Sequence, residues 1–108
     1  MDVELVELEN KRGELFFNIV DKITKLEIGI LFTVNNNVAY EIKPEFRGKG
    51  AATNALKLIT SQIKRPVLEI KHNNIASKRV AIKSGYVLVR EQSSFEIYEY
   101  LKDESKSK

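Results

Sequence analysis

The sequence predicts an α+β domain built on one mixed β-sheet, and three observations support this prediction. The chain has 108 residues, which is the length of one ordinary domain. Residues 3–43 contain runs in which apolar and polar side chains alternate, as they do in strands. Two later segments, 50–64 and 75–83, instead repeat apolar residues at helical spacing, and each lies between strand-like segments. The predicted order is β-β-β-β-α-β-α-β-β.

Four strands are expected in the first part of the chain, at residues 3–8, 14–20, 26–34 and 38–43. A turn signal separates each strand from the next. Residues 10–13 end in a glycine, Asp21 and Lys22 begin the second turn, and residues 35–37 are three asparagines, which tolerate positive φ. Because these connections are short, the four strands should pair as an antiparallel meander.

The next segment has the period of a helix over residues 50–64. Its apolar positions lie on one helical face: Ala51, Ala55, Leu56, Ile59 and Ile63. Pro66 cannot continue this helix because it has no backbone N–H to donate. We therefore expect the helix to end before Pro66 and a strand to follow at residues 67–71.

A second helix is expected at residues 75–83, since Asn73 and Asn74 can cap its start and Gly85 stands at the usual C-terminal position. Strands at 86–90 and 95–101 should form a final pair around the turn EQSS. The strands at 38–43 and 67–71 flank a helix, so they should be parallel with a right-handed crossover. The single domain should cover residues 1–101, with a disordered charged tail at 102–108.

Composition excludes several classes of site. The chain has no cysteine and one histidine, which excludes a disulfide, a thiolate metal site and a cysteine nucleophile and argues against any metal site. No run of 18 apolar residues is present, and the acidic N-terminus lacks the apolar core of a signal peptide. We therefore expect a soluble cytoplasmic protein that does not bind a membrane.

The net charge of +3 and the pI near 9.1 are mildly basic. A mildly basic protein of this kind is suited to bind nucleic acid or a small polyanion such as a nucleotide cofactor. A nucleic-acid-binding domain would need a basic face with interleaved aromatic residues, whereas lysine and glutamate alternate through most of this chain. We do not expect a nucleic-acid partner.

A basic, glycine-rich elbow joins the fourth strand to the first helix. A helix start offers unpaired N–H groups and a partial positive charge, and glycines let a ligand approach the backbone closely. The elbow and the small residues after it therefore suggest a phosphate site: Arg47, Gly48, Lys49, Gly50, Ala51 and Ala52. The alternative is a turn that uses glycine for its geometry alone.

Two well-known phosphate loops do not fit this elbow. The P-loop pattern G-x-x-x-x-G-K-[ST] fails because Lys49 is followed by Gly50 and no glycine stands at Lys43 or Pro44. The dinucleotide pattern G-x-G-x-x-G would begin at Gly48 and end at residue 53, which is a threonine.

A third pattern does fit. Residues 47–52 match R/Q-x-x-G-x-G/A, and the stretch resembles the coenzyme A pyrophosphate loop of the GNAT N-acetyltransferases, together with the preceding YEIKPEF. Residues 72–86, HNNIASKRVAIKSGY, resemble a second GNAT pattern, N-x-x-S-x-x-V-x-x-K-x-G-F/Y. That pattern falls on Asn74, Ser77, Val80, Lys83, Gly85 and Tyr86. The resemblance covers residues 26–101 and is strongest to the ribosomal-protein and related amino-terminal acetyltransferase branch.

The resemblance implies that acetyl-CoA lies in a gap between splayed fourth and fifth strands. Ile42 and Lys43 would face the pantetheine arm, and residues 47–52 would hold the pyrophosphate. Asn74 would contact the pantetheine arm, with a simple helix cap as the alternative. Arg79 and Lys83 would meet the nucleotide phosphates, or else form a solvated helix face.

The implied reaction is acyl transfer from the thioester to an amine. The Ile42 N–H would polarise the thioester carbonyl. Glu41 is the best candidate for the general base, directly or through a water, with a surface carboxylate as the alternative. Ser77 would lie near the sulfur and is a candidate proton donor. His72 is a weaker candidate proton carrier, because a lone histidine is more often structural.

The sequence departs from the family pattern in two places. Many members have a general-acid tyrosine seven residues after the asparagine, where this chain has Ala81. Members also carry two helices between the first two strands, where only residues 9–13 are available here. The acceptor site should then be open or be completed by a second subunit. We expect an N-acetyltransferase acting on a protein terminus, lysine or small amine; the alternative is a non-catalytic CoA-binding regulatory module.

Overall fold

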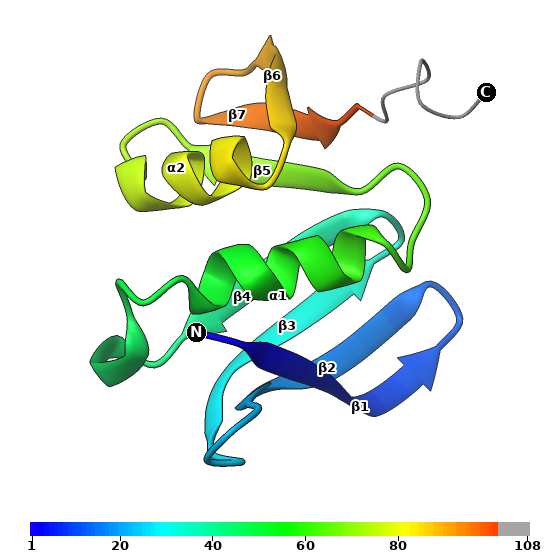
Figure 1. Ribbon diagram of the computed structural model, residues 1–108. Coiled ribbons are helices and arrows are strands. Elements are labelled where there is room, and N and C mark those ends of the chain that lie inside the picture. Colours follow the sequence, from blue (N-terminus) through cyan, green and yellow to red (C-terminus); the bar gives the residue numbers. More distant parts are fainter. Residues whose placement is uncertain (102–108) are drawn as a thin grey trace, which may run out of the picture.

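Seven strands form one mixed sheet in the order β1-β2-β3-β4-β5-β7-β6, with two helices packed on it (Figure 1). The computed structural model describes residues 1–101, and the predicted tail at 102–108 lies outside the described residues. The elements are β1 Val3–Lys11, β2 Glu14–Asp21, β3 Glu27–Val34, β4 Asn37–Ile42, α1 Ala51–Thr60, β5 Val67–Lys71, α2 Ile75–Lys83, β6 Tyr86–Glu91 and β7 Phe95–Tyr100, with one 3₁₀ turn at Pro44–Phe46. The α+β class and the predicted element order are confirmed.

The first four strands form the expected antiparallel meander. Only Arg12 and Gly13 connect β1 to β2, because β1 continues through Lys11, further than predicted. Gly13 has a φ of +77° and Asn35 a φ of +56°, which are the positive backbone angles that these tight turns require. The chain therefore has no helix between its first two strands.

Helix α1 ends at Thr60, so the predicted end at Lys64 is wrong. The hydroxyl of Thr60 donates to the Leu56 carbonyl, and that of Ser61 donates to the Leu58 carbonyl. Such side-chain bonds compete with the backbone bonds that would extend a helix. The chain then reverses through Arg65, at a φ of +49°, to enter β5.

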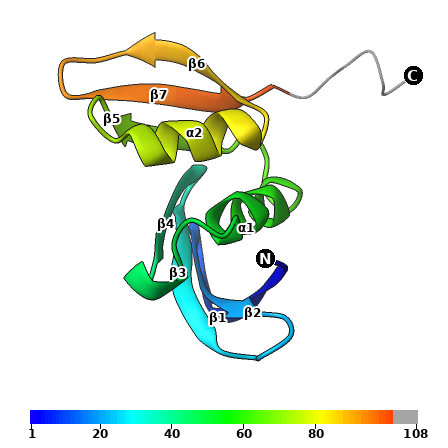
Figure 2. The same cartoon turned by 60° about the vertical axis from the view of Figure 1, so that its left-hand side comes forward.

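The core lies between α1 and one face of β1–β4. Apolar residues of α1, namely Ala51, Ala55, Leu56 and Ile59, pack with buried residues of the strands, namely Val3, Phe17, Ile19, Leu31, Val38 and Ile42. Figure 2 shows α1 against this face, whereas no helix within residues 1–101 covers the opposite one. Val6 and Ile30 are accordingly 43% and 42% exposed.

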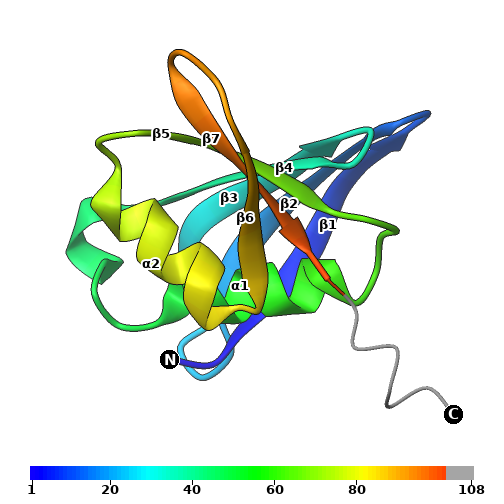
Figure 3. The same cartoon turned by 90° about the horizontal axis from the view of Figure 1, so that it is seen from above.

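Strands β4 and β5 are parallel but share a single residue pair, Asn37 with Val67. The Val67 N–H donates to the Asn36 carbonyl at 2.8 Å, and no further pair follows. Beyond this point the two strands diverge, which confirms the predicted splay. Figure 3 shows the elbow and the N-terminal ends of α1 and α2 on the same side of the molecule.

Candidate functional site

The splay leaves a cavity of about 350 Å³ between β4 and β5, closed at one end by the start of α2. Its lining comprises Val38, Ala39 and Tyr40 of β4, Leu68, Glu69, Ile70 and Lys71 of β5, and Asn74 and Ser77 at α2. The resemblance implied that Asn74 and Ser77 lie at this gap, and both line it in the structure.

The backbone of β4 presents hydrogen-bonding groups to the gap. The Lys43 N–H donates to the Ile28 carbonyl of β3 at 2.8 Å. Because alternate residues of an antiparallel strand face the same partner, the N–H groups of Tyr40 and Ile42 point away from β3. The Ile42 N–H thus faces the gap, as an oxyanion donor there would need to. The Lys43 amide is engaged with β3.

The elbow has the backbone of an anion site. Gly48 and Gly50 have φ values of +77° and +84°, and Gly50 is the N-cap of α1 without a side-chain cap. A Cβ on Gly48 would meet no atom within 4 Å, so the surrounding space is open. The first helical bond runs from the Asn54 N–H to the Gly50 carbonyl, which leaves the amides of residues 51–53 for a ligand.

Two basic side chains flank the elbow. Arg47 donates from Nε to the Ile42 carbonyl at 2.8 Å, and its guanidinium lies 3.7 Å from the Glu41 carboxylate. Lys49 places its Nζ 5.8 Å from the centre of the Phe46 ring, within the range of a cation–π contact. In this structure Arg47 is therefore turned back toward β4.

Asn74 serves as the N-cap of α2, because its side-chain oxygen accepts from the Ser77 N–H at 3.1 Å. Since Asn74 also lines the cavity, the cap and the ligand contact considered from the sequence are compatible. Arg79 and Lys83 are exposed. Lys83 lies in the last turn of α2, about 9 Å along the axis from Ser77 at 1.5 Å per residue, and its phosphate contact stays a prediction.

Glu41 occupies the opposite face of β4 from Tyr40 and Ile42, since neighbouring strand residues alternate faces. Its side chain is 74% exposed and pairs across the sheet with Ile30 of β3. The candidate base therefore stands on the uncovered face of the sheet and is not among the residues that line the cavity.

His72 belongs to a polar cluster at the end of β5. Its Nδ1 lies 3.1 Å from the buried Glu96 carboxylate and its Nε2 lies 2.8 Å from the Gln92 carbonyl. The hydrogen bond to Glu96, then that to Gln92, raises the pKa of His72. Both ring nitrogens face acceptors, which favours the protonated form of the imidazole and supports the structural role over that of a proton carrier.

Glu96 is the centre of this cluster. Lys78 of α2 lies 2.9 Å from Glu96, and the Tyr98 hydroxyl donates to Glu96 at 2.8 Å. Hydrogen bonds from Lys78, then from His72 and Tyr98, lower the pKa of Glu96 to about 2. Burial, followed by the bond to Glu96, raises the pKa of Tyr98 to about 12. Glu91 also lies near His72 and Glu96, but the Lys78 ammonium already supplies the cation that a metal would provide.

No sequence pattern pointed to Tyr40, which the structure places in the wall of the gap. Its hydroxyl is buried and has no hydrogen-bond partner within residues 1–101. Burial raises the pKa of Tyr40, and the nearby Ser77 side chain partly offsets that rise. The only sequence signal was its position two residues before Ile42, which puts both on one face of the strand.

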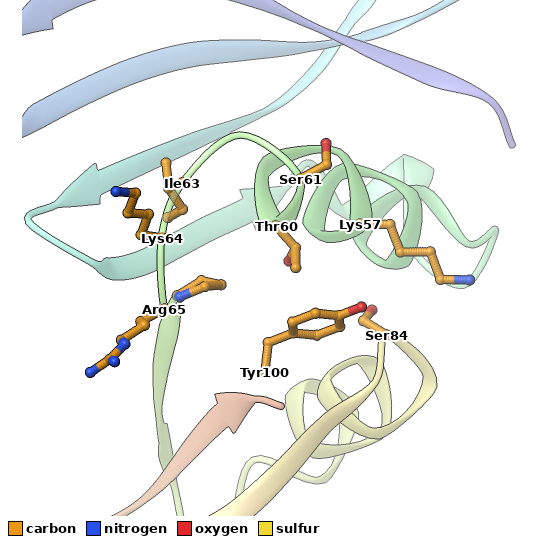
Figure 4. A pocket seen from close by; sticks show the side chains of 9 residues that line it. Lys57, Thr60, Ser61, Ile63, Lys64, Arg65, Ser84 and Tyr100 are labelled. Atoms are coloured by element: carbon orange, nitrogen blue, oxygen red, sulfur yellow. The ribbon is translucent and has the colours of Figure 1, made fainter. Parts of the chain in front are cut away.

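A larger cavity, of about 650 Å³, lies at the other end of α1 (Figure 4). It is lined by Lys57, Thr60, Ser61, Ile63, Lys64, Arg65, Pro66, Ser84 and Tyr100. It shares no residue with the gap between β4 and β5 and lies beyond the C-terminal end of α1, away from the glycine elbow. Size alone therefore does not identify the functional site.

No protein-family model matches the sequence, and no curated protein matches it. Solved structures do match. The N-acetyltransferase PseH of Campylobacter jejuni, in complex with acetyl coenzyme A, has a TM-score of 0.71 at 16% identity, over 85% of this chain and 70% of that one. RimL, a ribosomal L7/L12 alpha-N-protein acetyltransferase in complex with coenzyme A, has a TM-score of 0.69 at 17% identity, over 82% and 61%.

The microcin C7 self-immunity acetyltransferase MccE, in complex with acetyl-CoA and AMP, has a TM-score of 0.67 at 22% identity, over 82% of this chain and 61% of that one. The chain thus spans 61% to 70% of the length of these three proteins. Neither helix within residues 1–101 is long and apolar enough to cross a membrane. The strand order, the splayed β4 and β5 and the structural matches agree: the chain has the fold of the GNAT-family acetyltransferases.

Proposed function

We propose that this chain is an acetyl-CoA-dependent N-acetyltransferase that transfers an acetyl group to a primary amine. The proposal rests on one observation: the parts of the candidate site follow one another along the chain. The cavity between β4 and β5 is followed by the free edge of β4 and then by the glycine elbow with its open helix amides. This arrangement suits a long thioester cofactor with a pyrophosphate at one end, and the three structures above hold CoA or acetyl-CoA.

The cofactor would follow this track. Its pyrophosphate would accept hydrogen bonds from the amides of residues 48–52, where the start of α1 adds a partial positive charge. Arg47 and Lys49 would supply full charges. The pantetheine arm would lie along Ile42 and Lys43 on one side and Asn74 on the other.

The chemistry is attack of a neutral amine on the thioester carbonyl. A C–N bond forms, the C–S bond breaks with its electron pair going to sulfur, and the products are an acetamide and free CoA. The Ile42 N–H would stabilise the oxyanion of the intermediate. Glu41, directly or through a water, would take the proton that the amine loses.

The acceptor would approach from the uncovered face of β1–β4, where Glu41 stands. Only two residues connect β1 to β2, so no helix stands between these strands and this side is open. An open side suits a protein terminus, a lysine side chain or a small amine. This proposal includes a second copy of the chain, which would complete the acceptor site. The cytoplasmic location stays a prediction.

A non-catalytic CoA-binding regulatory module is the second candidate. Ala81 favours this candidate. It is buried and stands where the resemblance expects a general-acid tyrosine, and its side chain cannot donate a proton. Calorimetric titration with acetyl-CoA should show binding under both candidates, and absence of binding would exclude both.

Release of free thiol separates the two candidates. We expect acetyl-CoA to release thiol when a panel of peptides and amines is added. Release no faster than the uncatalysed rate for every acceptor would leave the regulatory module. Glu41→Gln should lower kcat by about 100-fold, because general-base catalysis contributes on that order, and spare the affinity for acetyl-CoA. Glu45→Gln, an exposed carboxylate on the 3₁₀ turn, is the matched control.

A further inference from the structure

The candidate site lacks a proton donor for the sulfur at the position where the resemblance expects one. Ala81 is fully buried on α2. Ser77, one turn earlier, carries a hydroxyl that is a poor acid. If acetyl transfer occurs as proposed above, the departing thiolate must take its proton from another group in the gap or from water.

Tyr40 has the placement that such a donor requires. It lines the gap with Ser77 and Asn74, so its phenol lies between β4 and the start of α2. Its hydroxyl is buried and has no partner within residues 1–101. An unpaired buried hydroxyl destabilises a folded protein, so a phenol at this position is best explained by a bond to something that enters the gap.

Alternation along β4 would place acid and base on opposite sides of a reacting carbon held at Ile42. Tyr40 and Ile42 lie on the face of β4 toward the helices, whereas Glu41 lies on the uncovered face. An amine that arrives beside Glu41 would attack one side of a thioester held at Ile42. The sulfur would then depart on the side of Tyr40 and Ser77.

We propose that Tyr40 is the catalytic acid of this site, donating its phenolic proton to the CoA sulfur as the C–S bond breaks. The bond electrons go to sulfur, the phenolic proton follows them, and the phenolate regains a proton from water when the products leave. Ser77, which lines the gap together with Tyr40, is then not itself the acid. Because burial raises the pKa of Tyr40, the phenol keeps its proton at neutral pH.

Tyr40→Phe tests this role because it removes only the hydroxyl. We expect kcat to fall by about 100-fold or more, as for loss of general-acid catalysis, with KM for acetyl-CoA within about twofold of the parent value. The melting temperature should stay the same or rise, because the lost hydroxyl has no partner in the folded protein. A purely structural hydroxyl would instead lower the melting temperature and leave kcat unchanged.

Tyr100→Phe is the matched control, since it makes the same chemical change in the other cavity and should leave kcat unchanged. Replacement of Tyr40 by 3-fluorotyrosine gives a second readout. The fluorine lowers the phenol pKa, so the alkaline limb of the kcat–pH profile should move to lower pH.

Two outcomes would overturn the assignment while leaving acetyl transfer in place: kcat of Tyr40→Phe within threefold of the parent, or an alkaline limb that the fluorine does not move. If the parent protein releases no thiol with any acceptor, the proposed function fails first and the role of Tyr40 fails with it.

Discussion

Gly50 shows how much one residue contributes to the candidate anion site. It caps α1 at a φ of +84°, a conformation that costs other residues about 1–2 kcal/mol. A Cβ at this position would have its nearest contact at 3.8 Å, from the Met1 nitrogen, so space does not exclude a side chain. Glycine is required here because of the positive φ and not for lack of space. The open space around it leaves room for a ligand.

Gly50→Glu should abolish acetyl-CoA binding, because it adds a carboxylate where the pyrophosphate would lie. We expect the dissociation constant, measured by calorimetry, to rise by more than about 100-fold, which corresponds to about 3 kcal/mol. Gly50→Ala is the control for backbone strain, since it introduces the same φ penalty without the charge. Equal affinities for the alanine and glutamate variants would show that the phosphate does not bind at the elbow.

For some single residues, the sequence could not assign a role. Glu41 and Tyr40 are adjacent, yet the strand directs them to opposite faces, and only the position of α2 shows which face the gap occupies. The role of His72 likewise depended on Glu96, 24 residues away. No periodic pattern predicts a contact between side chains so far apart along the chain.

At the scale of elements, the Glu96 cluster joins the end of β5, the first turn of α2 and β7. Lys78 comes from α2, His72 follows β5, and Glu96 and Tyr98 lie on β7. These bonds hold α2 in position on the strands, and α2 carries Asn74 and Ser77 at the gap. The cluster therefore supports the site without lining the cavity.

This cluster predicts a pH dependence of stability with a defined sign. His72 has a raised pKa when folded, so its contribution is complete below about 6.5 and is lost as the pH rises through the folded value. Glu96 has a lowered pKa, so its contribution is present above about 4.5 and is lost as the pH falls toward about 2. Both contributions are present together between about pH 4.5 and 6.5.

Thermal unfolding followed by circular dichroism checks this dependence. The melting temperature should fall as the pH rises above about 6.5, and His72→Gln should flatten that decrease. Because Lys78 and Tyr98 still donate to Glu96, His72→Gln should leave a decrease at acidic pH but move it to higher pH. A parent protein whose melting temperature rises as the pH increases above about 6.5 would contradict the raised pKa of His72.

At the scale of the whole molecule, two parts meet across the gap. One comprises β1–β4 with α1, and the other comprises β5–β7 with α2 (Figure 1). Because β4 and β5 share one residue pair, the sheet contributes little to holding them together. The connection depends on the apolar cluster in which Leu56 and Ile59 of α1 pack with residues of both parts, among them Leu31, Leu68 and Tyr86.

Leu56→Ala should therefore destabilise the entire fold and not α1 alone. Leu56 is fully buried, and truncation of such a leucine costs about 2–5 kcal/mol. Leu58→Ala, on the same helix but 37% exposed, should cost much less. Urea unfolding gives both values. A single cooperative transition in each variant is expected, and separate transitions for the two parts would contradict the idea of one shared core.

The sequence by itself determined the order of the elements and the position of the elbow, because both follow from local periodicity and turn residues. It also indicated the short connection between β1 and β2 and the family resemblance. It misjudged the end of α1, where the hydroxyls of Thr60 and Ser61 bond back to the helix. That competition depends on rotamers, which apolar spacing does not report.

Only the tertiary structure decided where the candidate chemistry lies. It showed that the gap is bounded by Tyr40 and Ser77, that Glu41 stands on the uncovered face, and that His72 is bonded to Glu96. The physical reason is that a gap and a hydrogen-bonded cluster arise from packing between distant segments. Each segment alone is compatible with several arrangements, and burial of a common core selects one of them.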